Sequence, residues 1–164
     1  MPLPDRPVDG AEIATDWGQA IHDYTFAPTG CTAHGAGVTC TTTATNLPID
    51  VADDDPGGWV DIVGNRLVAP TGADGLYIIM AAYNAVSGTL GDNVRGIVLL
   101  NGSQYATALA DSDGGVHVVW NVVSLVDVSA GDVFTFQGQK RGTGSNPGVS
   151  VVVSLVRIGA ELGA

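Results

Sequence analysis

The stretch NVRGIVLLNGSQYATAL, residues 93–109, decides the fold class. Its Asn101-Gly102 pair separates two candidate strands, Asn93–Leu100 and Ser103–Leu109. An Asn-Gly pair between strands is the strongest short-range signal for a two-residue β-hairpin, because both positions must adopt a positive φ. The sequence therefore predicts two antiparallel strands that turn at Asn101-Gly102.

Similar signals recur along the chain from about residue 36. Candidate strands alternate with Gly-, Asp-, Asn- and Pro-rich turns, such as Asp53–Gly58 and Gly142–Gly148. Turn signals at strand-length spacing are typical of an all-β sandwich or barrel. The other candidate strands are Val38–Thr45, Gly58–Ile62, Arg66–Val68, Gly75–Ala85, Val116–Val126, Asp132–Gln139 and Val149–Ile158.

The first thirty residues differ from the rest. Residues 1–8 contain three prolines, which predicts an extended arm. Asp9 and Glu12 form a capping-box pattern, and an apolar stripe at helical spacing then predicts one short helix over about residues 10–24. We expect an attachment region over residues 1–30 and one β domain over residues 31–164. The residues expected to dock are Arg6, Ile13, Trp17, Ile21 and Tyr24.

Composition excludes several classes of protein. The 164 residues include 17 acidic and 6 basic side chains, for a net charge of −11, which argues against binding to nucleic acid or to anionic membranes. No apolar run is long enough for a transmembrane helix, and the N-terminus lacks the features of a signal peptide, so we expect a soluble protein. Charged residues make up only 14% of the chain, which suggests that a partner covers part of the surface.

Two candidate strands are apolar on both faces. Both faces of Val116–Val126 and of Val149–Ile158 consist largely of apolar or small residues, and Val149–Ile158 has no charged side chain before Arg157. A lone two-layer sandwich has one wet face per sheet, so such strands indicate contact with another subunit. A deeply curved barrel is the alternative explanation. The residues expected in a trimer interface are Val118, Trp120, Val122, Val151, Val153 and Leu155.

The order of these segments resembles the C1q/TNF-like jelly roll. The residues that carry the resemblance are Val68-Ala69-Pro70 through Gly75-Leu76-Tyr77-Ile78-Ile79, then Ile97–Leu100 with Asn101-Gly102, then Val123–Val128 with Ala130-Gly131-Asp132-Val133-Phe134. The resemblance covers about residues 36–158. It implies an antiparallel jelly-roll sandwich of ten strands that assembles as a compact homotrimer, with apolar strands along its axis.

A second resemblance concerns the N-terminus. The segment from Arg6 to Trp17, followed by Gln19-Ala20-Ile21, is similar to the opening of many tail and head-appendage proteins of phages. Gly18 stands where those proteins usually have Asn. Together with a trimeric jelly roll, this similarity implies a virion surface protein of a tailed bacteriophage.

Signals for catalysis or metal binding are weak. His22, His34 and His117 belong to different predicted elements and show no zinc-ligand spacing, and no nucleophile elbow or phosphate-binding loop occurs. Asp53-Asp54-Asp55 lacks the spacing of a calcium loop, so we interpret it as a solvated acidic turn. We therefore expect no enzyme activity, no cofactor and no metal.

The two cysteines leave two states open. Cys31 and Cys40 flank His34-Gly35-Ala36-Gly37, so a disulfide could close this loop. A virion meets an oxidising exterior but assembles in reducing cytoplasm, so two free, half-buried thiols fit equally well.

These features together lead to one functional expectation and two alternatives. We expect a homotrimeric capsid decoration protein that stabilises the shell, assembled in the host cytoplasm and displayed on the virion surface. It would bind the major capsid protein or another virion protein through its N-terminal region. The first alternative is a tail or fibre tip that recognises host-surface glycans, for which Trp59, Tyr83 or Tyr105 would be exposed; the second is a free-standing carbohydrate-binding module.

Overall fold

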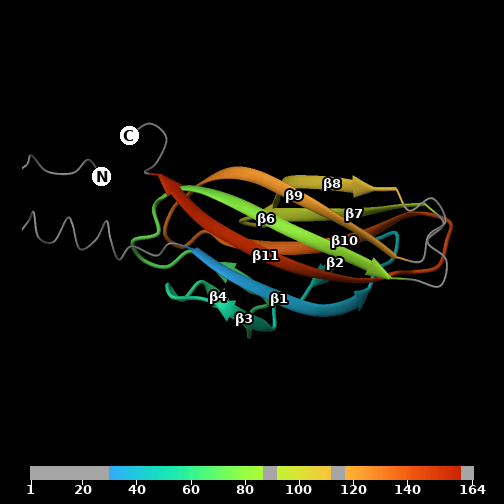
Figure 1. Cartoon of the computed structure of the whole chain (residues 1–164), viewed down its shortest axis with the longest axis horizontal. Coiled ribbons are helices and arrows are strands. Elements are labelled where there is room, and N and C mark those ends of the chain that lie inside the picture. The colour runs from blue at the N-terminus through green and yellow to red at the C-terminus, as the bar shows by residue number, and fades with distance from the viewer. Residues whose placement is uncertain (1–29, 87–91, 112–116, 160–164) are drawn as a thin grey trace, which may run out of the picture.

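Two antiparallel sheets pack face to face in the protein (Figure 1). The computed structural model describes residues 30–86, 92–111 and 117–159. Within these ranges every regular element is a strand, which confirms the all-β antiparallel sandwich. The strands are β1 (Gly30–Thr39), β2 (Thr45–Leu47), β3 (Val51–Asp54), β4 (Val60–Asp61), β5 (Arg66–Val68), β6 (Gly75–Val86), β7 (Asp92–Leu100), β8 (Ser103–Ala110), β9 (His117–Val128), β10 (Val133–Gly142) and β11 (Gly148–Gly159).

The strands divide between a five-stranded and a six-stranded sheet. The five-stranded sheet has the order β3-β1-β11-β6-β9. The six-stranded sheet has the order β4-β5-β10-β7-β8, with β2 also paired to β10. Because β11 lies between β1 and β6, the first and last described strands are neighbours. The described part of the chain therefore begins and ends at the same end of the sandwich (Figure 1).

The hairpin predicted at residues 93–109 is confirmed. β7 and β8 pair antiparallel, and Leu100 lies opposite Ser103. Asn101 and Gly102 have φ angles of 52° and 78°. Two successive positive φ values define the type I′ turn, whose twist matches that of the flanking strands.

Aromatic side chains from both sheets fill the core. Tyr83 stacks on Trp120 with ring centroids 5.4 Å apart, and Trp59 meets Tyr77 edge-on at 5.2 Å. Phe134 and Phe136 are fully buried on β10, whereas their neighbours Val133, Thr135 and Gln137 are half-buried. The alternation expected over Asp132–Gln139 is therefore present, and it fixes which face of β10 meets the core.

The sequence prediction is wrong at the first strand, and it missed β2 and β3, the second of which includes Asp53 and Asp54 of the predicted acidic turn. Val38–Thr45 was expected to be a strand and the segment between the cysteines a loop, but Gly30–Thr39 forms β1. This segment is extended because β11 on one side and β3 on the other supply its hydrogen bonds. At Gly35 a Cβ would lie 1.7 Å from the Pro48 carbonyl oxygen, so glycine allows a close approach that propensity rules do not anticipate.

Candidate interaction surface

Exposed aliphatic side chains gather on the outer face of the five-stranded sheet. Strand register places them in rows across β11, β6 and β9, such as Val156–Ile78–Leu125 and Ser154–Met80–Val123. The exposed fractions along these strands run from 41% for Met80 to 62% for Val123. We define the apolar sheet face by its exposed members, Met80, Val86, Val119, Val123, Leu125, Val152, Val156 and Ile158.

The centre of the apolar sheet face contains no charge. Between Ile78 and Asn84 on β6, and at the register positions opposite them on β9 and β11, the outward residues are aliphatic, Ser or Asn. Large contiguous exposed apolar surfaces are rare on monomeric proteins and are typical of sites that contact another protein, a membrane or a ligand. The inner side of the same strands already packs in the core, so this surface is not needed to fold the chain.

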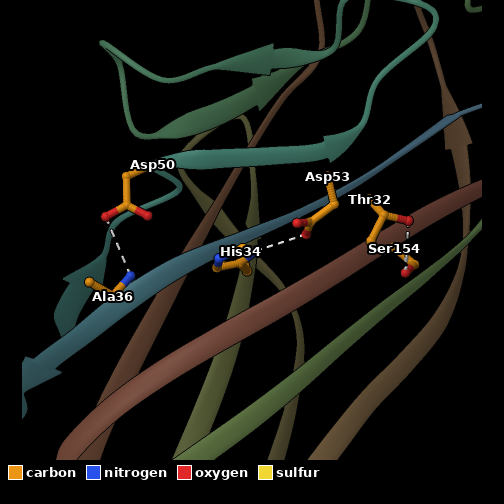
Figure 2. A network of polar contacts seen from close by, with 6 residues as sticks. All are labelled: Thr32, His34, Ala36, Asp50, Asp53 and Ser154. Atoms are coloured by element: carbon orange, nitrogen blue, oxygen red, sulfur yellow. Dashed lines mark hydrogen bonds and ion pairs between the residues drawn. The ribbon is translucent and has the colours of Figure 1, made fainter.

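A polar border closes one side of this surface (Figure 2). His34 on β1 lies 2.8 Å from the Asp53 carboxylate on β3, and both side chains are exposed. The Asp50 carboxylate accepts a hydrogen bond from the Ala36 amide at 3.4 Å. The charged groups therefore lie at the β1–β3 edge of the sheet and not over its aliphatic centre.

The opposite side of this surface carries the other described histidine. His117, at the start of β9, lies opposite Val86, and its Nε2 is 2.6 Å from Oδ1 of Asn84. Within residues 30–86, 92–111 and 117–159, His34 and His117 thus lie on strands at opposite sides of the sheet, and no group of three or more metal-ligating side chains occurs.

The residues predicted from sequence for a trimer interface face the interior of the chain, so that prediction is wrong for them. Most of them are buried in the core of the chain itself, with Val118 partly buried against it. Both faces of β9 and β11 are apolar, so alternation alone could not tell inward from outward. The residues concerned are Val118, Trp120, Val122, Val151, Val153 and Leu155.

The cysteines are free and far apart. Cys31 lies near the start of β1 and Cys40 directly after its end, so the extended strand separates them by about 30 Å, far beyond disulfide reach. Burial raises the pKa of the Cys31 thiol to about 12, helped by the nearby charges of Asp55 and Asp54, and raises that of Cys40 to about 11. The structure excludes a disulfide between these two residues, and both thiols are buried instead of half-buried.

The three consecutive aspartates are used separately. Asp53 contacts His34, whereas the Asp55 carboxylate accepts hydrogen bonds from the amides of Trp59 at 2.6 Å and Val60 at 3.0 Å. Asp54 is exposed on β3, opposite Thr32. Asp55 thereby fixes the turn that inserts Trp59 into the core, a structural role that the sequence did not reveal.

The aromatic residues named for a glycan site are mostly in the core. Trp59 and Tyr83 are fully buried, and Tyr105 is 40% exposed. The Tyr105 hydroxyl donates a hydrogen bond to the Leu125 carbonyl, which links β8 to β9. The expected docking residues Arg6, Ile13, Trp17, Ile21 and Tyr24, and the short helix that carries them, lie outside the described residues.

Comparison with known proteins supports the fold. No family model and no curated protein sequence matches the chain. Among solved structures it is similar to the globular domain of zebrafish complement 1qA protein, with a TM-score of 0.60 and 8% sequence identity over 81% of this chain and 99% of that chain. The similarity confirms the expected C1q/TNF-like fold. Within the described residues no helix could span a membrane.

Proposed function

We propose that the chain is a homotrimeric capsid decoration protein of a tailed bacteriophage. In this proposal the apolar sheet face joins three copies, and the N-terminal region attaches them to the major capsid protein or another virion protein. The observation that supports self-association is the uncharged aliphatic surface over β6, β9 and β11, which the chain's own core leaves exposed.

Charge restricts where copies of the same chain could meet. Each copy has a net charge of −11, so identical chains repel one another at most places on their surfaces. Contact through a face whose centre carries no charge keeps the acidic groups apart and buries aliphatic area. Burial of several hundred Å² per chain would stabilise the assembly by on the order of 10 kcal/mol before the cost of association. The threefold arrangement follows from the resemblance to C1q/TNF-like domains.

The virion setting rests on the resemblance of the N-terminal segment to phage appendage proteins. The described β domain is compatible with it, since Gly30 enters the sandwich at the end where Gly159 leaves it. Residues 1–29 are therefore attached at one end, which leaves the other end free to project from a particle. Localisation to the virion surface and the absence of enzyme activity remain expectations of this proposal.

The alternative, a tail or fibre tip that recognises glycans through exposed aromatic residues, has less support. Trp59 and Tyr83 pack in the core, so they cannot stack on a sugar ring. Only Tyr105 of the three is partly accessible, and its hydroxyl is already hydrogen-bonded to Leu125.

Three measurements test the proposal. Native mass spectrometry of the purified chain should give three times the monomer mass, and a stable monomer would overturn the trimer. Quantitative mass spectrometry of purified particles should then count the copies. Hundreds of copies per virion indicate decoration, a handful indicates the tail alternative, and none contradicts a virion role. Removal of residues 1–27 should abolish attachment to particles while the trimer stays folded.

A further inference from the structure

Four strands of the six-stranded sheet contain more basic than acidic residues, unlike the protein as a whole. Three of the six basic residues, Arg95, Lys140 and Arg141, belong to β7 and β10. Apart from Asp92 at the first position of β7, the sequences of β2, β7, β8 and β10 contain no Asp or Glu. In a chain with 17 acidic residues, these four strands are therefore unusually poor in acid, whereas β4 of the same sheet contributes Asp61.

Arg95 is held in place by neutral groups. Its Nε donates a hydrogen bond to Oγ1 of Thr107 at 2.8 Å, and its Nη2 donates one to Oε1 of Gln104 at 2.6 Å. Both acceptors come from β8, so the guanidinium lies across the β7–β8 pair. These bonds orient the side chain but leave its positive charge uncompensated. By contrast, the guanidinium of Arg66 is paired with the Asp61 carboxylate at 2.7 Å.

A second arginine lies beside Arg95. Register pairs Arg95 with Gln139 and places Arg141 opposite Asn93, so the two arginines are diagonal neighbours on adjacent strands, with Cα atoms about 7–8 Å apart. Within the described residues neither has a carboxylate partner. Lys140 does not add to the pair, because its Nζ is bound to the Gly144 carbonyl and to Asn146.

The two arginines are diagonal neighbours, a spacing still within reach of long side chains, so both guanidinium groups can approach one ligand. Around them, β2, β8 and β10 carry amide and hydroxyl side chains, some of whose groups already bond within the chain: Thr107 donates to the Gly96 carbonyl, Gln137 to Asn46 and Gln139 to the Thr42 carbonyl. The exposed Leu109 lies opposite Arg95. We define the arginine face as Arg95 and Arg141 with the neighbouring polar side chains Asn46, Gln104, Thr107, Gln137 and Gln139.

We propose that the arginine face binds an acidic polysaccharide whose sugars carry carboxylates. A guanidinium matches a carboxylate in geometry and can hold it with two parallel hydrogen bonds. Amide and hydroxyl side chains can both donate to and accept from sugar hydroxyls. The two positive charges at this spacing would engage carboxylates on one polymer chain, while the amides contact the rings between them.

Nucleic acid fits this surface less well than a polysaccharide. A duplex brings a dense row of phosphates toward a protein whose overall charge is −11, and only two uncompensated cations meet it here. The arginine face also lacks an aromatic side chain on which a base could stack. A polysaccharide with one charge per sugar has a lower charge density and more hydroxyls.

The arginine face is independent of the apolar sheet face. It lies on the other sheet, so contact between copies through β6, β9 and β11 leaves it accessible. Arg141 lies near the end of β10, at the end of the sandwich opposite to the one where Gly30 enters (Figure 1). Attachment through residues 1–29 would therefore keep this surface away from the particle.

Binding of polygalacturonate to the full-length purified protein tests this inference by isothermal titration calorimetry. The wild type should bind, and Arg95→Gln and Arg141→Gln should each weaken binding about tenfold or more, because each removes a charge-assisted contact. Arg66→Gln, which removes the same charge from a different sheet position, should leave the affinity unchanged. Circular dichroism and the oligomeric mass of each variant serve as controls, and both should match the wild type.

Three further ligands complete the experiment. Methyl-esterified polygalacturonate lacks the carboxylates and should bind at least tenfold more weakly. A short DNA duplex and poly-glutamate carry negative charge without sugar carboxylates, and both should bind more weakly than polygalacturonate. The inference is overturned by no binding, by an equal loss in Arg66→Gln, or by equal affinity for DNA or poly-glutamate. None of these results depends on whether the protein is a trimer or a virion component.

Discussion

The ring of Tyr83 lies directly against the backbone of Gly96, so that a Cβ at residue 96 would be 2.6 Å from its Cδ2 and Cε2 atoms. Tyr83 belongs to the five-stranded sheet and Gly96 to the six-stranded sheet. The Tyr83 hydroxyl donates a hydrogen bond to the Ile97 carbonyl at 2.8 Å, and its ring stacks on Trp120. One glycine thus sets how closely the two sheets approach at the centre of the sandwich.

Replacement of Gly96 by alanine should destabilise the protein strongly. The ring of Tyr83 cannot move away without breaking its bond to Ile97 and its contact with Trp120. Overpacking of this kind costs about 1–3 kcal/mol, and we expect the upper end of that range. Urea unfolding followed by circular dichroism measures the change. Gly37→Ala is the control, since a Cβ at this exposed strand position meets no atom within 4 Å. Equal stability of the two variants would contradict the packing argument.

Asp55→Ala should destabilise the protein through the turn that carries Trp59. The Asp55 carboxylate satisfies the amides of Trp59 and Val60, and the variant leaves both without an acceptor. We expect a loss of about 1–3 kcal/mol in the free energy of unfolding. Asp54→Ala removes the same charge from an exposed neighbour whose side chain makes no hydrogen bond to a described residue. An effect as large in Asp54→Ala would show that charge alone, and not the turn, is responsible.

The sequence predicted those strands in which one face differs chemically from the other. On β10, Phe134 and Phe136 alternate with Thr135 and Gln137, and the expected burial is present. The bounds of β5 and the turn at Asn101-Gly102 were likewise predicted, because short polar segments isolate them. In each case a local contrast in polarity or turn chemistry carried the information.

Where the two faces of a strand have similar residues, only tertiary packing determines which face meets the core. On β9, Trp120 and Val122 face the core while Val119 and Val123 face outward, and nothing in the residue types distinguishes the two faces. β1 is rich in Gly and Ala, which have low strand propensity. Its hydrogen bonds to β11 and β3 hold it in the extended form. The arginine face was not predicted because register, which the sequence does not reveal, brings Arg95 and Arg141 together.

Both cysteines should resist thiol reagents while the protein is folded. Burial holds the pKa of Cys31 at about 12 and that of Cys40 at about 11, above the ordinary value of 9.0, so the reactive thiolate is scarce at neutral pH. Ellman's reagent should report two thiols in denaturant and nearly none before unfolding.

The free energy of unfolding should also fall as the pH rises from about 9 toward these raised pKa values, because the unfolded chain releases its thiol protons first. Mass spectrometry that showed an intrachain disulfide in the native protein would contradict the structure.

The Asp61 carboxylate should remain ionised at an unusually low pH. The Gly64 amide and the guanidinium of Arg66 both donate hydrogen bonds to it, and these lower its pKa below the ordinary value of 3.8. A lowered pKa gives stability that is present above the ordinary value and is lost as the pH falls through the shifted one. The difference in unfolding free energy between wild type and Asp61→Asn should therefore be constant near neutral pH and shrink under acid conditions. Carboxyl chemical shifts of Asp61 in an NMR titration provide the direct check, and a midpoint at or above 3.8 would refute it.

Val123→Glu should break the proposed trimer without unfolding the chain. Val123 is 62% exposed on β9, opposite Met80 and near the uncharged centre of the apolar sheet face. A carboxylate there is solvated in the monomer but would lose water in an interface, at a cost of several kcal/mol for each buried charge. Sedimentation velocity should therefore show a monomer with unchanged circular dichroism.

Val63→Glu provides the matched control for this prediction. Val63 is 95% exposed in the turn between β4 and β5, on the other sheet, and the substitution adds the same charge. If repulsion between acidic chains alone limited assembly, both variants would dissociate to the same extent. If the apolar sheet face is the contact, only Val123→Glu dissociates, and added salt restores little of the trimer because the lost term is desolvation and not long-range repulsion. A Val123→Glu protein that remains a trimer at low micromolar concentration would place the contact between copies elsewhere on the molecule.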